Sequence, residues 1–187
     1  MDNWATLLRE AFESLPGEDI PISKGQVYLL PCGTKTYTWL IREGVFFTSL
    51  RVEGAEGELA NTVWRKGWII HSLDTDITLP AHAMTDGVLR KVDSSELNAL
   101  IRGNAELGFA LAEHYHAQFT RTLLHYRLAA LEPSKQRLVR FEEYFANIPE
   151  LEGERIDDTT MSLFMGMHRV SVSRLRREIL KDDEKCE

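Results

Sequence analysis

Arginine and serine side chains are concentrated on one side of a predicted helix near the end of the chain. Two short amphipathic helices are predicted between Thr160 and Ile179, with Gly166 between them where a left-handed turn residue is needed. In the second helix, apolar residues recur at helical spacing, and the side chains left to face outward are Arg169, Ser173, Arg174 and Arg177. Guanidinium and hydroxyl groups donate hydrogen bonds to phosphate oxygens and base edges. The pattern therefore indicates a helix that is presented to a DNA groove.

The apolar faces and the charge of this motif support the same interpretation. Met161, Phe164 and Met165 form one face of the first helix, and Val172, Leu175 and Ile179 one face of the second. The basic residues between positions 161 and 181 are Arg169, Arg174, Arg176, Arg177 and Lys181, opposed only by Glu178. Charged runs are ordinarily solvated helix faces. On the second helix of a helix-turn-helix, we interpret this run as a phosphate-facing surface.

Length and composition place the chain among ordinary globular proteins. Its 187 residues, 43% of them hydrophobic, suffice for one large domain or two small ones. The net charge of -7 argues against indiscriminate binding of nucleic acid. No apolar run reaches the length of a membrane span and the start lacks a signal peptide, so we predict a cytoplasmic protein without a membrane partner. Cys32 and Cys186 are far apart, which argues against a disulfide framework, a zinc ribbon and a four-cysteine iron-sulfur cluster.

The first half of the chain is predicted to consist of one helix and many short strands. The helix covers residues 4–15 and ends at Pro16-Gly17. Short β-prone runs then recur at a spacing of roughly 8 to 12 residues, separated by turn residues, which predicts an antiparallel sandwich or barrel. The predicted strands cover residues 27–30, 36–41, 45–52, 59–63, 68–73 and 88–92.

From residue 93 onward the pattern is helical. Asp93 and Glu96 form a capping box for a short helix that Gly103 ends, and Asn104 can cap the helix that follows. That helix is predicted over residues 105–131, which makes it about 40 Å long at about 1.5 Å per residue. A small domain does not need such a length for itself, so we expect a second chain to cover its far end. A further helix is predicted from Pro133 to about residue 145, followed by a loop.

The order of these elements resembles that of the Crp/Fnr family of bacterial transcription regulators, over nearly the whole chain. Segments 30–33, 41–45 and 65–70 resemble the family's β-roll turns, and segment 166–174 is similar to its Gly-x-Ser-Arg-Glu-Thr-Val-Ser-Arg pattern. The resemblance implies an α+β fold with an N-terminal antiparallel, jelly-roll-like β-roll, a long dimerisation helix and a C-terminal helix-turn-helix. It divides the chain into an effector-sensing β-roll with flanking helices (residues 1–103), a dimerisation helix and hinge (104–132) and a DNA-binding domain (133–187).

The resemblance also implies a small-molecule effector, and the sequence indicates that this is not cyclic AMP. Family members that bind cyclic nucleotides use a Gly-Glu pair for the ribose and an Arg-Ser or Arg-Thr pair for the phosphate. No such pair follows Gly67, and no arginine occurs between Arg65 and Arg90, where carboxylates would repel a phosphate. The candidate effector-pocket residues are Trp68, His71, Ser72, His82, Arg121, Thr122 and His125.

Cofactors and catalysis receive little support from the sequence. Some relatives sense gases through haem, and His71 and His82 lie where a pocket is expected, although a histidine in a strand is more often only hydrogen-bonded. His114 and His116 point about 200° apart on a helix and cannot bind one metal from the same chain. No nucleophile-base pair or metal cluster is visible, so we expect neither an enzyme nor a metal site. Tryptophans in the β-roll are expected in the core or in a pocket for an apolar effector.

The helix-turn-helix departs from the family pattern at two places. Val170 stands where many relatives carry a glutamate that reads cytosine; a valine can instead pack against a thymine methyl group. Arg169 and Arg174 match base-reading and phosphate-reading arginines in the family, and Ser171 and Ser173 match positions that contact backbone or bases. Arg177 is a further candidate because it faces outward on the same helix. The sequence ends in an acidic segment where relatives have a β-hairpin wing, which would be reduced or absent. We therefore predict a homodimeric regulator of a pseudo-palindromic DNA site, with an effector-binding or protein-interaction module that has lost DNA binding as the alternative.

Overall fold

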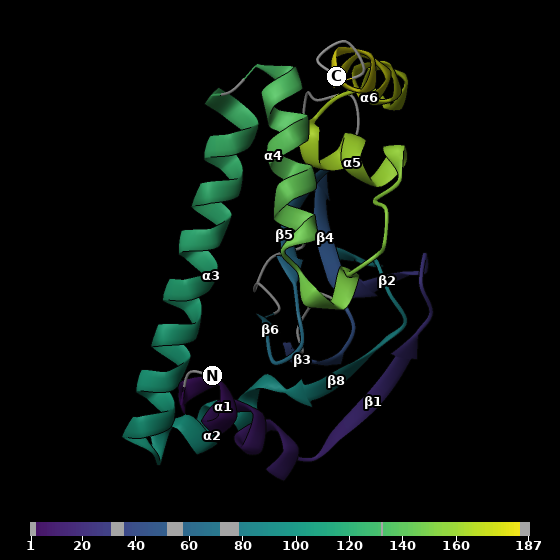
Figure 1. Cartoon of the computed structure of the whole chain (residues 1–187). Helices are drawn as coiled ribbons and strands as arrows, with labels where there is room; N and C mark the ends of the chain where they lie inside the picture. Colours follow the sequence, from purple (N-terminus) through teal and green to yellow (C-terminus); the bar gives the residue numbers. More distant parts are fainter. Residues whose placement is uncertain (1–2, 31–35, 52–57, 72–78, 132, 184–187) are drawn as a thin grey trace. The chain divides into compact units, whose positions relative to one another are not determined.

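A computed structural model describes residues 3–30, 36–51, 58–71, 79–131 and 133–183, and Figure 1 labels their helices and strands. The helices are α1 (Asn3–Ser14), α2 (Ser94–Arg102), α3 (Ala105–Leu131), α4 (Ser134–Ala146), the 3-10 helix η1 (Pro149–Leu151), α5 (Asp158–Met165) and α6 (Arg169–Asp183). The strands are β1 (Gly17–Ile22), β2 (Val27–Leu30), β3 (Tyr37–Glu43), β4 (Phe46–Arg51), β5 (Glu58–Trp64), β6 (Ile69–His71), β7 (Leu79–Ala83) and β8 (Gly87–Asp93). None of the described helices is both long and apolar enough to cross a membrane.

The chain divides into two compact units. The first consists of Met1–Thr48 and Thr62–Arg121, and the second of Ser49–Asn61 and Thr122–Glu187. The division passes through α3 after Arg121, whereas the sequence predicted boundaries on both sides of this helix, after residues 103 and 132. It also assigns the end of β4 and the start of β5 to the second unit.

The strands form two four-stranded sheets. One has the order β1-β8-β3-β6 and the other the order β2-β7-β4-β5, and every strand pair with a determined register is antiparallel. This confirms the predicted β-roll. Two strands were not predicted, β1 and β7, and both contain a proline. Proline lacks the N–H that a sheet requires, so from sequence alone it indicates a turn or a sheet edge.

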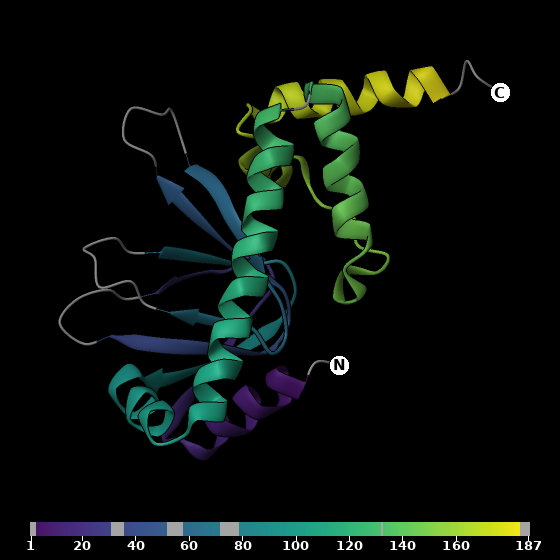
Figure 2. The ribbon, with the colours of Figure 1, turned by 90° about the vertical axis from the view of Figure 1, so that its left-hand side faces the viewer.

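Strand β3 is buried on both faces because helices cover one face of its sheet. Leu40 and Ile69 belong to a core cluster with Phe12 of α1, Leu97 of α2 and Leu107 of α3. Trp39 and Ile41, which alternate with Leu40 along β3, are also wholly buried. Figure 2 shows α1 and α2 beside the first turns of α3. The first turns of α3 are therefore held against the β-roll by apolar packing.

The turn between β3 and β4 requires a glycine. Gly44 has a φ of 85°, and a Cβ atom there would lie 2.6 Å from the carbonyl oxygen of Asp86. Both the backbone conformation and the close approach exclude a side chain. The Gly44 that the sequence placed in a family-like hairpin is thus explained by the packing of the β3–β4 turn on the β7–β8 turn.

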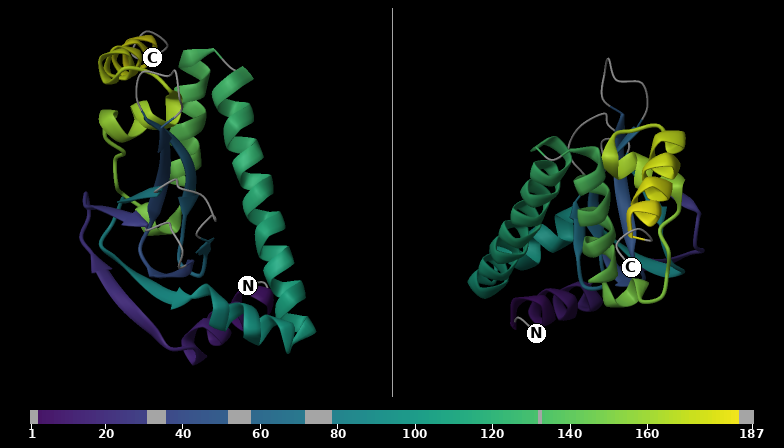
Figure 3. Two further views of the ribbon diagram at one scale, coloured as in Figure 1. Left: turned by 180° about the vertical axis from the view of Figure 1, so that it is seen from behind. Right: turned by 45° about the horizontal axis from the view of Figure 1, so that its top comes forward.

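In the second unit, α4, α5 and α6 pack on one another (Figure 3). The rings of Phe141 and Phe145 on α4 lie 5.9 and 5.0 Å from the ring of Phe164 on α5. Met161 and Met165 are buried beside them, as predicted. Among described residues 133–183, no strand is present. The acidic end of the chain, residues 184–187, lies outside the described residues.

Candidate DNA-binding surface and effector region

The N-terminus of α5 is fixed by Asp157. Its carboxylate accepts hydrogen bonds from the backbone N–H groups of Thr159 at 2.7 Å and Thr160 at 2.9 Å, and from the Thr160 hydroxyl at 2.8 Å. Burial acts to raise the pKa of Asp157, but these hydrogen bonds favour the charged form and lower its pKa overall. An ionised carboxylate therefore caps the positive end of α5.

Gly166 ends α5 in the left-handed conformation, with φ 59° and ψ 41°. The N–H of Gly166 and that of Met167 both donate to the carbonyl oxygen of Ser162, the latter at 3.1 Å. Leu59 of β5 would lie 3.1 Å from a Cβ atom at position 166. The predicted turn between the two helices is confirmed, and its left-handed conformation explains the glycine.

Helix α6 buries one side and exposes the other. Val172 is wholly buried. At about 100° per residue, four side chains lie within about 40° of the direction opposite Val172. These four, all exposed, form what we call the α6 stripe: Val170, Arg174, Arg177 and Lys181. Val170 is 72% exposed. The stripe thus presents an apolar side chain near the N-terminus of α6 and cations beyond it.

The other predicted DNA-contacting residues flank the α6 stripe. Arg169 is exposed, and Ser171 and Ser173 are half-buried. Within the stripe, Nε of Arg174 lies 3.8 Å from Oε1 of Glu178, one turn further along the helix. A contact of this length between exposed side chains contributes little and is easily exchanged for a phosphate. The first three turns of α6 therefore carry the predicted donors at the surface.

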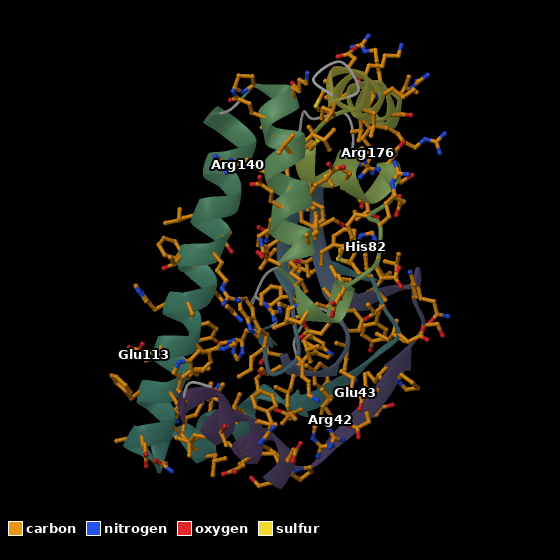
Figure 4. The ribbon with its side chains drawn as sticks, viewed as in Figure 1. Arg42, Glu43, His82, Glu113, Arg140 and Arg176 are labelled. Atoms are coloured by element: carbon orange, nitrogen blue, oxygen red, sulfur yellow. The ribbon has the colours of Figure 1, made fainter. Side chains whose placement is uncertain are left out.

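Arg176 does not belong to this surface. It is 8% exposed, its Nε donates to Oε1 of Glu142 at 2.9 Å and its Nη2 to the carbonyl oxygen of Ile156 at 2.8 Å. Its Nη1 donates to the carboxylate of Asp158. The guanidinium therefore ties α6 to α4, to α5 and to the segment before α5, and Figure 4 shows it between α6 and α5. Counting Arg176 in a phosphate-facing surface was wrong, because two carboxylates already neutralise its charge.

In the first unit, β6 and Trp68, the residue before it, contact polar and aromatic side chains. The guanidinium carbon of Arg121 on α3 is 4.5 Å from the ring centroid of Trp68, a cation–π contact. Nδ1 of His71 is 2.8 Å from the hydroxyl of Thr38, which is 2.8 Å from the hydroxyl of Ser94. Burial lowers the pKa of His71 and favours its neutral form. Of the candidate effector-pocket residues, His71 is thus part of β6, and Trp68 and Arg121 lie beside this strand.

Two α3 side chains bind the backbone of β6 directly. The N–H of Ile69 donates to Nε2 of His114 at 3.1 Å, and Nε2 of Gln118 donates to the carbonyl oxygen of Ile69 at 2.7 Å. His114 must accept through Nε2, so its proton is on Nδ1, which is buried and has no hydrogen-bond partner among the described residues. We call His114 and Gln118 the α3 clamp.

The surroundings of the α3 clamp are aromatic. The ring of His114 lies edge-on to those of Trp4 at 5.4 Å, Trp68 at 6.0 Å and Tyr115 at 5.8 Å. Burial lowers the pKa of His114 to about 4, although the carbonyl oxygen of Ile69, 3.5 Å from Nε2, acts in the opposite direction because it favours a protonated nitrogen. His114 is therefore neutral at physiological pH.

No known sequence-family profile matches the chain, and a sequence comparison with curated proteins finds no significant match. Solved structures do match. A transcriptional regulator of the Crp/Fnr family from Eubacterium rectale superposes with a TM-score of 0.71 at 13% identity, over 97% of this chain and 85% of its own. The chain has the Crp/Fnr fold.

Two further structures with this fold are similar. The c-di-GMP-responsive global regulator CLP of Xanthomonas campestris has a TM-score of 0.77 at 15% identity, with coverage of 95% of this chain and 93% of CLP. FixK2 of Bradyrhizobium japonicum has a TM-score of 0.72 at 14% identity, with coverage of 90% and 87%. The order of elements read from the sequence is thus the order in the Crp/Fnr fold.

The remaining effector-pocket predictions are dispersed over this Crp/Fnr fold. His82 lies on β7 in the other sheet, where its ring stacks on that of Phe47 at 4.4 Å. Thr122 belongs to the second unit. Ser72 and the side chain of His125 lie outside the described residues, as does Cys32. The structure therefore groups Trp68, His71 and Arg121 near β6 and places His82 elsewhere in the β-roll.

Sequence reasoning missed the α3 clamp, and it treated histidines mainly as metal ligands. His114 and His116 do face different ways, because His114 is wholly buried and His116 is exposed. Among the described residues, no three His, Cys, Asp or Glu side chains are grouped closely enough for a metal. The spacing of His114 and Gln118, four residues apart, was the available signal for one polar helix face.

Proposed function

We propose that this protein is a cytoplasmic, homodimeric, sequence-specific DNA-binding transcription regulator, controlled by a small molecule other than cyclic AMP. The observation that carries the proposal is the α6 stripe on the second helix of a helix-turn-helix. An exposed helix with Arg174 and Arg177 beside an apolar Val170 has the donors for phosphates and base edges and a contact for a thymine methyl group. The similarity to solved structures of transcription regulators supports the same function.

Dimerisation is supported by an exposed apolar row on α3. Phe109, Phe119 and Leu123 are 68%, 63% and 51% exposed. With Ala112 and His116, also exposed, they follow a spacing of three and four residues, which is the heptad pattern of a two-helix seam. We call these five residues the α3 seam. Large apolar side chains in such a row are covered by a partner in a soluble protein, and a second copy of α3 offers the matching row.

Control by a small molecule is supported by the β-roll. Arg121 of α3 and Trp68 lie beside β6, and the buried Nδ1 of His114 still has a proton to donate. A ligand with a planar apolar body and an acceptor atom matches these groups better than an adenosine phosphate. The similar regulator CLP is described as responsive to c-di-GMP, which supports an effector without identifying it.

Selection from random double-stranded DNA tests the function. Full-length protein should enrich a pseudo-palindromic site with half-sites about 34 Å apart, one helical turn, because a two-fold dimer presents two recognition helices. Cell extract should be included in one arm to supply an effector. No enriched sequence in either arm would contradict DNA-binding regulation and favour a module that binds ligands or proteins only.

Two variants connect the selected site to the α6 stripe. Arg174→Ala should lower the affinity for specific and non-specific DNA alike and reduce the salt dependence of binding. Arg140→Ala removes an exposed arginine on α4, whose ion pair among the described residues is with Glu143 of the same helix at 3.1 Å, and serves as the charge-matched control. If the two variants bind DNA with equal affinity, Arg174 does not belong to the DNA-binding surface.

A further inference from the structure

A histidine occupies the middle of the α3 seam, where the neighbouring seam side chains are apolar. His116 follows the buried His114 by two residues, so it points about 200° away, on the side of α3 opposite β6. Glu113, one turn earlier, also lies on the side of α3 that faces away from the sheets in Figure 4. His116 is exposed in the single chain, and a partner helix at the seam would cover it.

Dimer symmetry brings two copies of this histidine together. Both recognition helices must reach one DNA duplex, which requires the two α3 helices to run parallel. In a parallel pair, each seam position lies against the same position of the other helix. His116 would therefore face the second copy's His116 across the two-fold axis, between layers made by Ala112 and Phe119. In such a pair, the imidazoles would lose part of their contact with water.

We propose that this histidine pair makes the dimer sensitive to protons, so that acidification separates the chains and reduces DNA binding. The inference rests on the proposed dimer. Histidine changes charge within the physiological pH range. Two imidazolium groups in a covered seam repel each other and lose hydration. The separated chains therefore bind more protons than the dimer, and the dissociation constant must rise as the pH falls.

The groups around His116 modify this effect without removing it. His116 is exposed, so the groups that face it are those of its own helix and of the second copy. On its own helix these are Glu113, three residues earlier, and the uncharged Thr120, four residues later. Glu113 would stabilise one imidazolium, but it lies beside the seam and not in it. Glu113→Gln should therefore make the dimer more sensitive to acid.

Sedimentation measurements of the full chain at pH 8.0 and pH 6.0 test the inference, with circular dichroism to confirm that the chain is folded at both. The wild-type dissociation constant should rise about tenfold between these values, because histidines in water change from mostly neutral to mostly protonated. His116→Leu should dimerise more tightly and change less than twofold. His168→Gln, which removes an exposed histidine of the α5–α6 turn, should retain the wild-type response.

Cross-linking tests the geometry independently of pH. In a background with both native cysteines replaced by serine, His116→Cys should form a disulfide-linked dimer on oxidation, whereas Ala117→Cys on the neighbouring helix face should not. A dimer whose dissociation constant does not depend on pH, or depends on it equally in His116→Leu, contradicts the histidine inference alone. A chain that stays monomeric at pH 8.0 contradicts the proposed dimer as well.

Discussion

The buried imidazole of His114 should make the stability of the first unit depend strongly on pH. Its pKa is about 4 in the folded chain against 6.5 for an exposed histidine. The unfolded chain therefore takes up a proton between pH 6.5 and 4 that the folded chain refuses, and the free energy of unfolding must fall as the pH falls through this window. At about 1.4 kcal/mol per pKa unit, the full loss is about 3 kcal/mol, of which about 2 kcal/mol is reached at pH 5.

The variant His114→Gln isolates this contribution. Glutamine is neutral at every pH and can still accept a hydrogen bond from the N–H of Ile69. The variant is less stable than wild type at neutral pH, because the ring packing is lost. The difference between the two should shrink by about 2 kcal/mol between pH 7.5 and pH 5. Contributions of other groups, including the half-buried His71, cancel in this difference when they act independently.

Urea unfolding followed by tryptophan fluorescence is a suitable assay. All four tryptophans of the chain lie within Met1–Thr48 and Thr62–Arg121, so the signal reports on the first unit. Protein concentration must be fixed, because association contributes to apparent stability. His168→Gln should follow the wild-type pH profile. The reasoning would be refuted if the difference in the free energy of unfolding between wild type and His114→Gln stayed constant between pH 7.5 and 4.5. An NMR titration of the His114 ring with its midpoint near pH 6.5 would refute it as well.

Three further results are expected. Arg176→Met should reduce the free energy of unfolding of the second unit by about 3 kcal/mol, because it leaves two carboxylates without their cation. Arg177→Met should change this free energy by less than about 0.5 kcal/mol. Chemical unfolding followed by circular dichroism distinguishes the two variants. Asp157→Ala should cost about 1 kcal/mol in the same assay and Asp157→Ser much less, since serine also caps helices; equal losses would argue against the cap. In the selected DNA site, replacing the thymine nearest Val170 by deoxyuracil should weaken binding about fourfold, since a buried methyl contributes about 0.8 kcal/mol, and Val170→Ser should reduce this discrimination in a fluorescence-anisotropy titration.

Much of the fold could be predicted because its signals are local. Glycine and proline turns at regular spacing indicated most strands of the β-roll, and an uninterrupted helical pattern indicated α3. Strand β7 was missed because Pro80 suggested a turn. In the structure, β7 pairs with β2 and β4, and these tertiary contacts outweigh the local preference of one residue.

The candidate site could be predicted only where exposure follows from helical periodicity. Val170 and Arg174 were correctly expected at the surface of α6. Arg176 was not distinguished from its neighbours, because its partners Glu142 and Asp158 are 34 and 18 residues away in sequence. The α3 clamp was missed for a similar reason, since His114 binds a backbone group 45 residues earlier. The four-residue spacing of His114 and Gln118 places both on one helix face but does not indicate the strand that they bind.

The α3 clamp also has a consequence for association. Among the described strands, β6 ends its sheet, and such a terminal strand offers unpaired backbone groups to strands of other molecules. His114 and Gln118 occupy the N–H and carbonyl groups of Ile69, so a helix blocks the place where a foreign strand would add. If α3 swings away from the β-roll, that position becomes available for intermolecular strand pairing. Attachment of α3 to β6 therefore protects the protein from aggregation.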